Sequence, residues 1–70
     1  MKLVANDYEA KDILRIIREW LDLTQADFGK NIDRCERTIQ EYEAGRTKYS
    51  MNMVLDLAKK HGIKITFEKQ

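Results

Sequence analysis

Residues 24–45 read TQADFGKNIDRCERTIQEYEAG, and this segment predicts two short helices separated by a tight turn. We expect the first helix over residues 24–31, because Thr24 is a suitable N-cap and Asp27 follows three residues later, close to the capping-box spacing. We expect the second helix over residues 35–44, where apolar residues recur at helical spacing among polar ones. The first of these helices is barely two turns long and marginal alone, so it needs neighbours to pack against.

The turn and the second helix depend on a few particular residues. Asp33 is one of the few non-glycine residues that tolerate a left-handed backbone, and Gly45 suits the position just after a helix end. Ile39 and Tyr42 are expected to fasten the second helix to the core. The opposite face of that helix then points outward and carries the polar residues Glu36, Arg37, Gln40 and Glu41.

Two further helices flank this segment. Residues 10–21 place apolar residues at i, i+3, i+4, i+7 and i+8, which predicts one face of an amphipathic helix. Those residues are Ile13, Ile16, Ile17, Trp20 and Leu21, and we expect Trp20 to lie in the core. A last helix begins after Ser50 and runs to His61, where Gly62 ends it.

The two ends of the chain predict short strands. Residues 63–68, IKITFE, alternate apolar and polar positions and are rich in β-branched residues. Residues 2–5 are the candidate partner, and the sequence leaves open whether such strands pair within one chain or across a dimer. The fold class is therefore mainly α: a compact domain of four helices with short N- and C-terminal β-strands.

The length and composition of the chain limit the classes of function that it can have. Seventy residues form one domain, residues 1–70, whose thin core argues against an enzyme with a deep, water-excluding cleft. Thirteen Lys and Arg against twelve Asp and Glu give a net charge of +1, which is not the signature of a protein that coats nucleic acid by charge alone. No arrangement of residues suggests nucleophilic or acid–base catalysis, so we expect neither an enzyme nor a cofactor.

The single cysteine and the single histidine narrow the setting. Cys35 cannot form a disulfide within the chain, which favours a reducing, cytoplasmic location. Cys35 and His61 are too few for an ordinary zinc site, so no metal is expected. The longest apolar runs are two or three residues, which excludes a transmembrane span and predicts no membrane partner.

Residues 24–45 closely resemble the motif of the lambda-repressor-like (Cro/cI, or XRE) helix-turn-helix family. That family reads Ser/Thr-Gln at its first motif helix, then a small residue, then a second helix that ends in aromatic-Glu-x-Gly. Here these are Thr24-Gln25, Gly29 and the run YEAG at residues 42–45. The resemblance covers roughly residues 10–63, and it departs at the turn, where Asp33, Arg34 and Cys35 stand in place of a glycine, an apolar residue and a Ser/Thr cap.

The resemblance implies a sequence-specific DNA-binding transcription regulator, a small repressor or autoregulator that binds a palindromic operator as a homodimer. The implied base-reading residues are Glu36, Arg37, Gln40 and Glu41, of types suited to cytosine, guanine and adenine edges. The implied phosphate contacts are Thr24, Gln25, Thr38, Arg46, Thr47 and Lys48. Arg18 and Glu43 occupy the positions of a structural salt bridge in this family.

An alternative of another class stays open. The same fold can serve as a protein-interaction module, such as an antitoxin whose main partner is a toxin protein rather than double-stranded DNA. Residues 24–48 carry five basic and five acidic residues, so bulk attraction to DNA from one copy of the motif is small. The operator sequence, the regulated genes and the direction of regulation are not encoded in any readable pattern.

Overall fold

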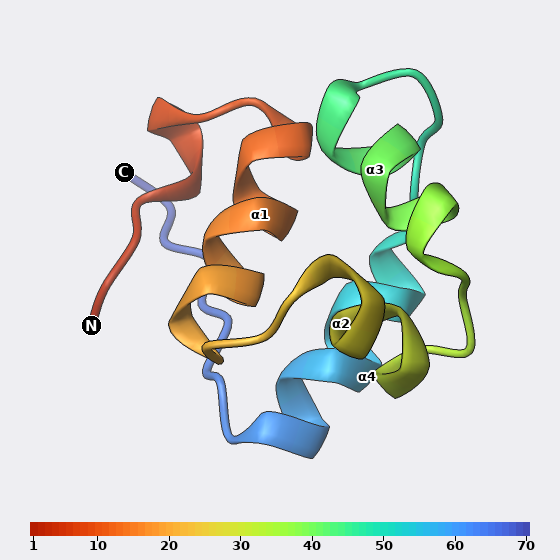
Figure 1. Cartoon of the computed structure of the whole chain (residues 1–70). Coiled ribbons are helices and arrows are strands. Elements are labelled where there is room, and N and C mark those ends of the chain that lie inside the picture. The colour runs from red at the N-terminus through yellow and green to blue at the C-terminus, as the bar shows by residue number, and fades with distance from the viewer.

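A computed structural model describes the whole chain, residues 1–70, and contains four α-helices preceded by one 3₁₀ turn (Figure 1). The elements are η1 (Ala5–Asp7), α1 (Ala10–Trp20), α2 (Gln25–Asn31), α3 (Glu36–Ala44) and α4 (Met51–His61). The mainly α, four-helix prediction is confirmed, and the predicted helix ends agree with the structure to within a residue. None of these helices is both long enough and apolar enough to cross a membrane.

Local capping explains where the helices start and stop. The Thr24 hydroxyl accepts a hydrogen bond from the Asp27 backbone N–H at 3.1 Å, and Ser50 accepts one from Met53 in the same way at 3.1 Å. Both contacts satisfy backbone donors that a helix start leaves free. Gly45 ends α3 with φ +78°, a left-handed conformation that costs glycine little.

The core takes one large side chain from each helix. Leu14 of α1, Phe28 of α2, Ile39 of α3 and Leu57 of α4 are the largest fully buried side chains. Because each helix contributes one of them, no helix can leave without exposing the other three. The hydrophobic effect therefore fixes the four helices as one packed unit.

The predicted inner face of α1 is partly wrong. Leu14, which the spacing argument left out, is fully buried, and Ile17 is buried beside it. Ile16 and Trp20 are only half-buried and do not belong to the hydrophobic cluster or to the side chains packed on it. Apolar residues cover more than one side of α1, so the sequence period alone could not show which side faces the other helices.

The prediction of paired terminal strands is also wrong. Residues 2–5 lead into η1, and residues 63–70 form no helix or strand. A strand needs a neighbouring strand for its backbone hydrogen bonds, and here Ile63 is the last residue with a backbone–backbone hydrogen bond. Alternation in the sequence indicated a strand, but the fold offers it no partner.

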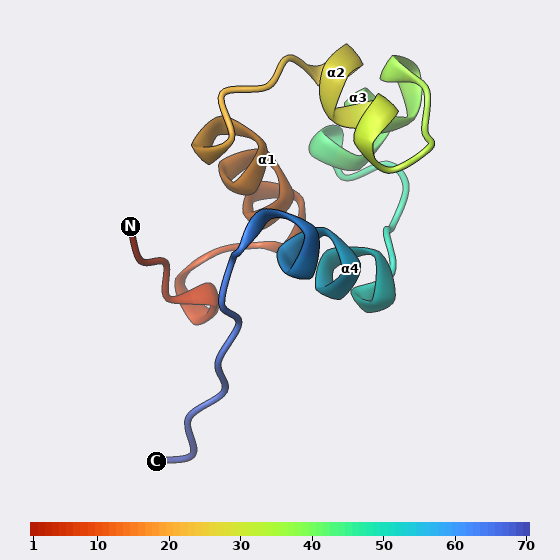
Figure 2. The same cartoon turned by 90° about the horizontal axis from the view of Figure 1, so that it is seen from below.

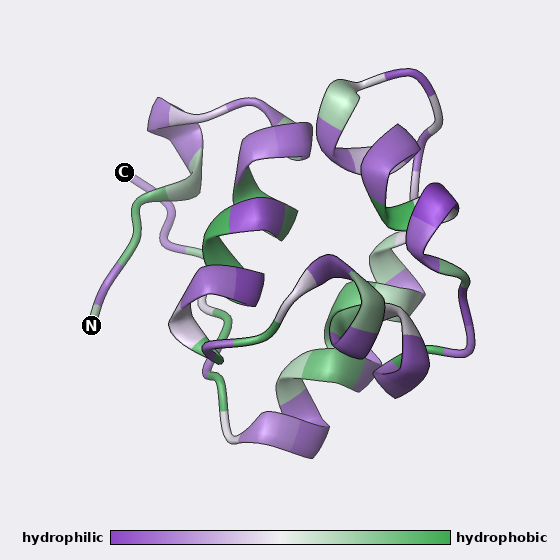
Figure 3. Ribbon diagram, viewed as in Figure 1, coloured by the Kyte–Doolittle hydropathy of each residue, from purple (hydrophilic) through white to green (hydrophobic).

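The terminal segments and the α2–α3 pair lie on different sides of the molecule. Figures 1 and 2 both show α2 and α3 together on one side, with the N- and C-terminal segments beside α1 and away from them. Figure 3 shows α3 as mostly hydrophilic, whereas α1 and α4 carry hydrophobic stretches. The polar helix of the motif thus lies on the side of the molecule away from the chain ends.

Candidate nucleic-acid interface

The turn between α2 and α3 is held by a close backbone approach. The Arg34 backbone N–H donates to the Gly29 carbonyl oxygen at 2.8 Å, and a Cβ on residue 29 would collide with the backbone oxygen of Arg34. Asp33 has the left-handed backbone that the sequence led us to expect, with φ +55°. The Arg34 guanidinium turns back to donate to the Asp33 carbonyl at 3.1 Å, so it braces the turn.

The residue directly before α3 is a weak helix cap. Cys35 occupies the N-cap position of α3, and its side chain makes no hydrogen bond to the helix backbone. Its sulfur instead lies 3.3 Å from the Thr38 hydroxyl oxygen. That hydrogen bond is the main cause that lowers the pKa of the Cys35 thiol.

The outward face of α3 is open over its first half. Glu36, Arg37 and Gln40 are exposed, and no hydrogen bond or ion pair involves their side chains. Ile39 and Tyr42 on the opposite face are buried, so the helix cannot rotate without exposing them. This fixed orientation leaves three polar side chains free to contact a partner.

Glu41 differs from the other three predicted base-reading residues. It is half-buried, and its carboxylate accepts a hydrogen bond from the Arg46 Nε at 3.2 Å. This contact joins a predicted base reader to a predicted phosphate contact. Because the Arg46 side chain is 65% exposed, the pair is weak and can open at a cost of about 0–1 kcal/mol.

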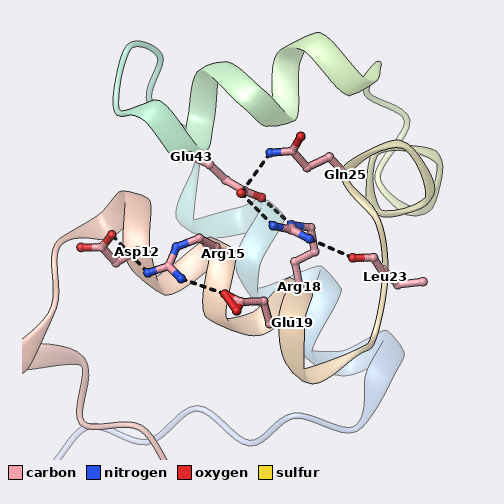
Figure 4. Close-up of polar contacts among 7 residues, drawn as sticks. All are labelled: Asp12, Arg15, Arg18, Glu19, Leu23, Gln25 and Glu43. Carbon is pink, nitrogen blue, oxygen red and sulfur yellow. Dashed lines mark hydrogen bonds and ion pairs between the residues drawn. The ribbon is translucent and has the colours of Figure 1, made fainter.

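An ion pair ties α1 to α3 beneath the motif (Figure 4). The Arg18 guanidinium donates to both carboxylate oxygens of Glu43, with Nε–Oε2 at 2.7 Å and Nη2–Oε1 at 3.0 Å. Its remaining Nη1 donates to the Leu23 carbonyl at 3.0 Å. The hydrogen bond to Glu43 is the main cause that raises the pKa of Arg18, although burial opposes it. This is the pair that the resemblance implied.

Gln25 joins the same network instead of pointing freely outward. Its Nε2 donates to Glu43 Oε1 at 3.2 Å, so the start of α2 is tied to the end of α3. An amide nitrogen carries two hydrogens, so one remains for a phosphate oxygen. Gln25 is therefore a positioning residue in this structure and keeps one donor for the predicted phosphate contact.

The other predicted phosphate contacts fall into two groups. Thr24 and Thr38 are engaged locally, Thr24 as the cap of α2 and Thr38 with Cys35, and the Thr24 hydroxyl, which accepts, can still donate one hydrogen bond. Arg46, Thr47 and Lys48 are exposed in the loop that follows α3. The exposed face of α3 therefore lies between Thr38, in the first turn of that helix, and the loop that follows its last turn.

Lys11 is a basic residue near this site that the motif spacing does not indicate. The Lys11 side chain of α1 lies over the end of α3, with its Cδ 3.2 Å from the place where a Cβ on Gly45 would sit. The sequence does place Lys11 near the motif, because it lies seven residues, or two helical turns, before Arg18 and so on the same helix face. Neither residue belongs to the motif, which is why a motif-centred reading passed over Lys11.

Comparison with protein-family models shows what this arrangement is. Residues 14–67, well over half of the chain, match a model described as helix-turn-helix. No curated protein and no solved structure matches the chain. The match begins after the first turn of α1 and covers the rest of that helix. It also covers the whole α2–turn–α3 unit and all of α4. The chain therefore belongs to the helix-turn-helix family, of the lambda-repressor-like kind that its motif residues resemble.

Proposed function

We propose that this protein is a sequence-specific DNA-binding transcription regulator, a small repressor or autoregulator that reads a palindromic operator as a homodimer. The observation that carries the proposal is the outward face of α3, where Glu36, Arg37 and Gln40 are exposed and unengaged while Ile39 and Tyr42 anchor the helix from behind. An α-helix with its side chains is about 10–12 Å across, which fits a major groove about 12 Å wide.

Base reading is assigned to the side chains of that face. Arg37 can donate two hydrogen bonds to the O6 and N7 of guanine, and Gln40 can pair with adenine. Glu36 and Glu41 can accept from the cytosine amino group, Glu41 after its weak pair with Arg46 opens. Two carboxylates in the groove would reject many sequences by repulsion, which favours selectivity over general affinity.

Phosphate contacts are assigned to residues at the helix starts and to the loop after α3. Thr24 and Gln25 offer a hydroxyl and an amide donor at the start of α2, and Thr38 offers a hydroxyl once its contact with Cys35 opens. Arg46, Thr47 and Lys48 offer charge and a hydroxyl in the loop. Such contacts fix the register of a protein on the duplex without reading its sequence. Glu43 does not repel the backbone strongly, because Arg18 pairs with it and its side chain is 8% exposed.

Two observations support a homodimer. Residues 24–48 carry as many acidic as basic residues, so two copies are needed for firm binding to a polyanion. The terminal segments, on the side away from α2 and α3, expose large apolar side chains that one copy does not cover, those of Val4, Tyr8, Ile65 and Phe67. Two recognition helices held about 34 Å apart would meet half-sites one helical turn apart.

The test is selection of bound duplexes from a random DNA pool, followed by mobility-shift titration of the selected site. We expect a palindrome, and we expect Arg37→Ala to lose about 1–3 kcal/mol of discrimination at one base pair while Lys48→Ala weakens all sequences alike. Lys59→Ala is the matched control, because Lys59 is exposed in the last turn of α4 and lies outside the motif. No selected sequence, or an Arg37→Ala profile identical to that of Lys59→Ala, would show that the main partner is not DNA read by α3.

A further inference from the structure

We propose that Lys11 of α1, together with Thr47 and Lys48, forms a second phosphate-binding groove at the C-terminal end of α3, outside the helix-turn-helix motif. The groove would hold a phosphate of the same duplex whose major groove α3 enters. The inference rests on the proposed function and adds to it a contact from a helix to which no DNA contact has been assigned.

The geometry comes from the end of α3. Gly45 has no side chain, and the aliphatic part of Lys11 occupies the space above it. An open groove of about 480 Å³ lies here, and its lining includes Lys11, Thr47 and Lys48 and the aromatic residues Tyr42 and Tyr49. The two tyrosine rings meet edge to face with centroids 5.8 Å apart, so this wall of the groove is well packed.

The start of α1 is held against this loop. The Tyr49 hydroxyl donates to the Ala10 carbonyl oxygen, which links the segment after α3 to the first turn of α1. Lys11 follows directly, so its position relative to Lys48 is set by a contact across the groove rather than by side-chain freedom alone. Two ammonium groups and a hydroxyl on one groove provide the donors that a phosphate oxygen requires.

One acidic group lines the same groove and opposes binding. The Glu9 carboxylate lies 3.9 Å from the Lys11 Nζ, and the Glu9 side chain is 78% exposed. An exposed pair at this distance contributes little to stability, so a phosphate can compete for Lys11. Glu9 makes no side-chain capping hydrogen bond to α1, so its charge can be removed without disturbing the helix start.

The position of the groove favours DNA phosphate as the occupant. The groove begins where α3 ends, and it is continuous with the loop that carries Arg46, Thr47 and Lys48. A helix lying in a major groove has a phosphate strand along each wall of that groove. The strand nearest the end of α3 would therefore pass over residues of α1 as well as over the loop.

The test is the salt dependence of binding to the selected operator and to an unrelated duplex. We expect Lys11→Gln to raise the Kd about three- to tenfold on both duplexes, and to reduce the slope of log K against log salt by about 0.9. Glu9→Gln removes a carboxylate from the same groove, so it should act in the opposite direction and lower the Kd. Lys59→Gln, which removes the same charge from the last turn of α4, should change neither quantity on this scale.

The outcomes separate this inference from the proposed function. Suppose that Arg37→Ala loses base discrimination while Lys11→Gln shows the same salt dependence of binding as Lys59→Gln. The phosphate-binding groove is then wrong, and the proposed function still holds. If Lys11→Gln lowers affinity but leaves the slope unchanged, the residue acts by supporting α3, and the phosphate contact is wrong. If the wild-type protein binds no duplex, both are wrong. Thermal unfolding of each variant, expected to match wild type, shows that the helices remain folded.

Discussion

At Gly29 the backbone of α2 passes so close to the turn that a methyl group has no room. A Cβ there would meet the Arg34 backbone oxygen, and neither backbone can move without separating α2 from the entry to α3. We expect Gly29→Ala to lower the free energy of unfolding by about 2 kcal/mol, measured by urea denaturation. Part of the clash is offset because alanine favours a helix more than glycine does.

Gly62→Ala separates steric clash from backbone strain. Residue 62 has φ +69° but open space around its Cβ position, so the cost there is strain alone, about 1 kcal/mol. We expect Gly29→Ala to be the more damaging of the two and to weaken DNA binding as well, because it shifts α3. Equal losses for the two variants would show that close approach at Gly29 is not what holds the turn.

Between elements, the Arg18–Glu43 pair is the polar contact that joins α1, α2 and α3. Its side chains are 17% and 8% exposed, and Gln25 and the Leu23 carbonyl complete the network. We expect Arg18→Met and Glu43→Gln each to cost about 2–4 kcal/mol of stability, because each leaves a partly buried charge unpaired. The double variant should cost less than the sum of the two by about 1–3 kcal/mol in urea denaturation.

The Arg15–Glu19 pair is the control for that cycle. It is also an Arg–Glu contact, with 2.8 Å between Nη1 and Oε1, but both side chains are far more exposed and both belong to α1. Removal of either partner should cost about 0–0.5 kcal/mol. If the two pairs gave equal coupling energies, the idea that the Arg18–Glu43 pair holds three helices together would be wrong.

The link between α1 and the loop after α3 should make stability sensitive to alkaline pH. Burial raises the pKa of Tyr49, whose hydroxyl donates to the Ala10 carbonyl. In the unfolded chain a tyrosine titrates near pH 10, so the folded state binds the proton more tightly. The resulting stability is complete below about pH 10 and is lost as the pH rises through the higher folded value.

We therefore expect Tyr49→Phe to flatten the fall in stability above about pH 10, measured by urea denaturation at a series of pH values. At neutral pH the same variant should lose about 1 kcal/mol, because the hydrogen bond to Ala10 is gone. Tyr8→Phe, at an exposed position, should keep the alkaline fall of the wild type. An unchanged fall in Tyr49→Phe would assign the alkaline sensitivity to other groups.

The helices were predictable from the sequence where their signals are local. Thr24, Ser50, Gly45 and Gly62 act within one turn of the backbone, so the helix ends could be placed to within a residue. The terminal segments could not, because a strand depends on a partner that alternation does not reveal. The choice of Leu14 over Trp20 for the core likewise depends on where the other helices lie.

The exposed residues of the candidate site were predictable from the sequence, but the contacts between their side chains were not. The spacing of the motif identified Glu36, Arg37 and Gln40 as outward residues, and they are exposed. The pairing of Glu41 with Arg46 and the use of Gln25 to hold Glu43 follow from side-chain positions that spacing does not give. Lys11 was missed because it comes from a helix outside the motif.

For the molecule as a whole, the apolar side chains of the terminal segments point to its state of assembly. Phe67 is 83% exposed and Val4 56%, although the core is small and each buried apolar residue counts. We expect the wild-type protein to be a dimer by sedimentation equilibrium, and Phe67→Glu to shift it toward monomer. Thr66→Glu is the matched control, because it adds the same charge in the same exposed segment without removing an apolar side chain.

If the protein dimerises as proposed, DNA affinity and assembly are linked, and a second measurement tests that link. On an operator with two half-sites, Phe67→Glu should bind at least about tenfold more weakly than wild type, since the second half-site is then bound independently. On a duplex with one half-site, the two proteins should bind alike, because Phe67 lies in the C-terminal segment, away from α2 and α3. A wild-type protein that sediments as a monomer and selects a single half-site would contradict the homodimer while leaving α3 as the reading helix.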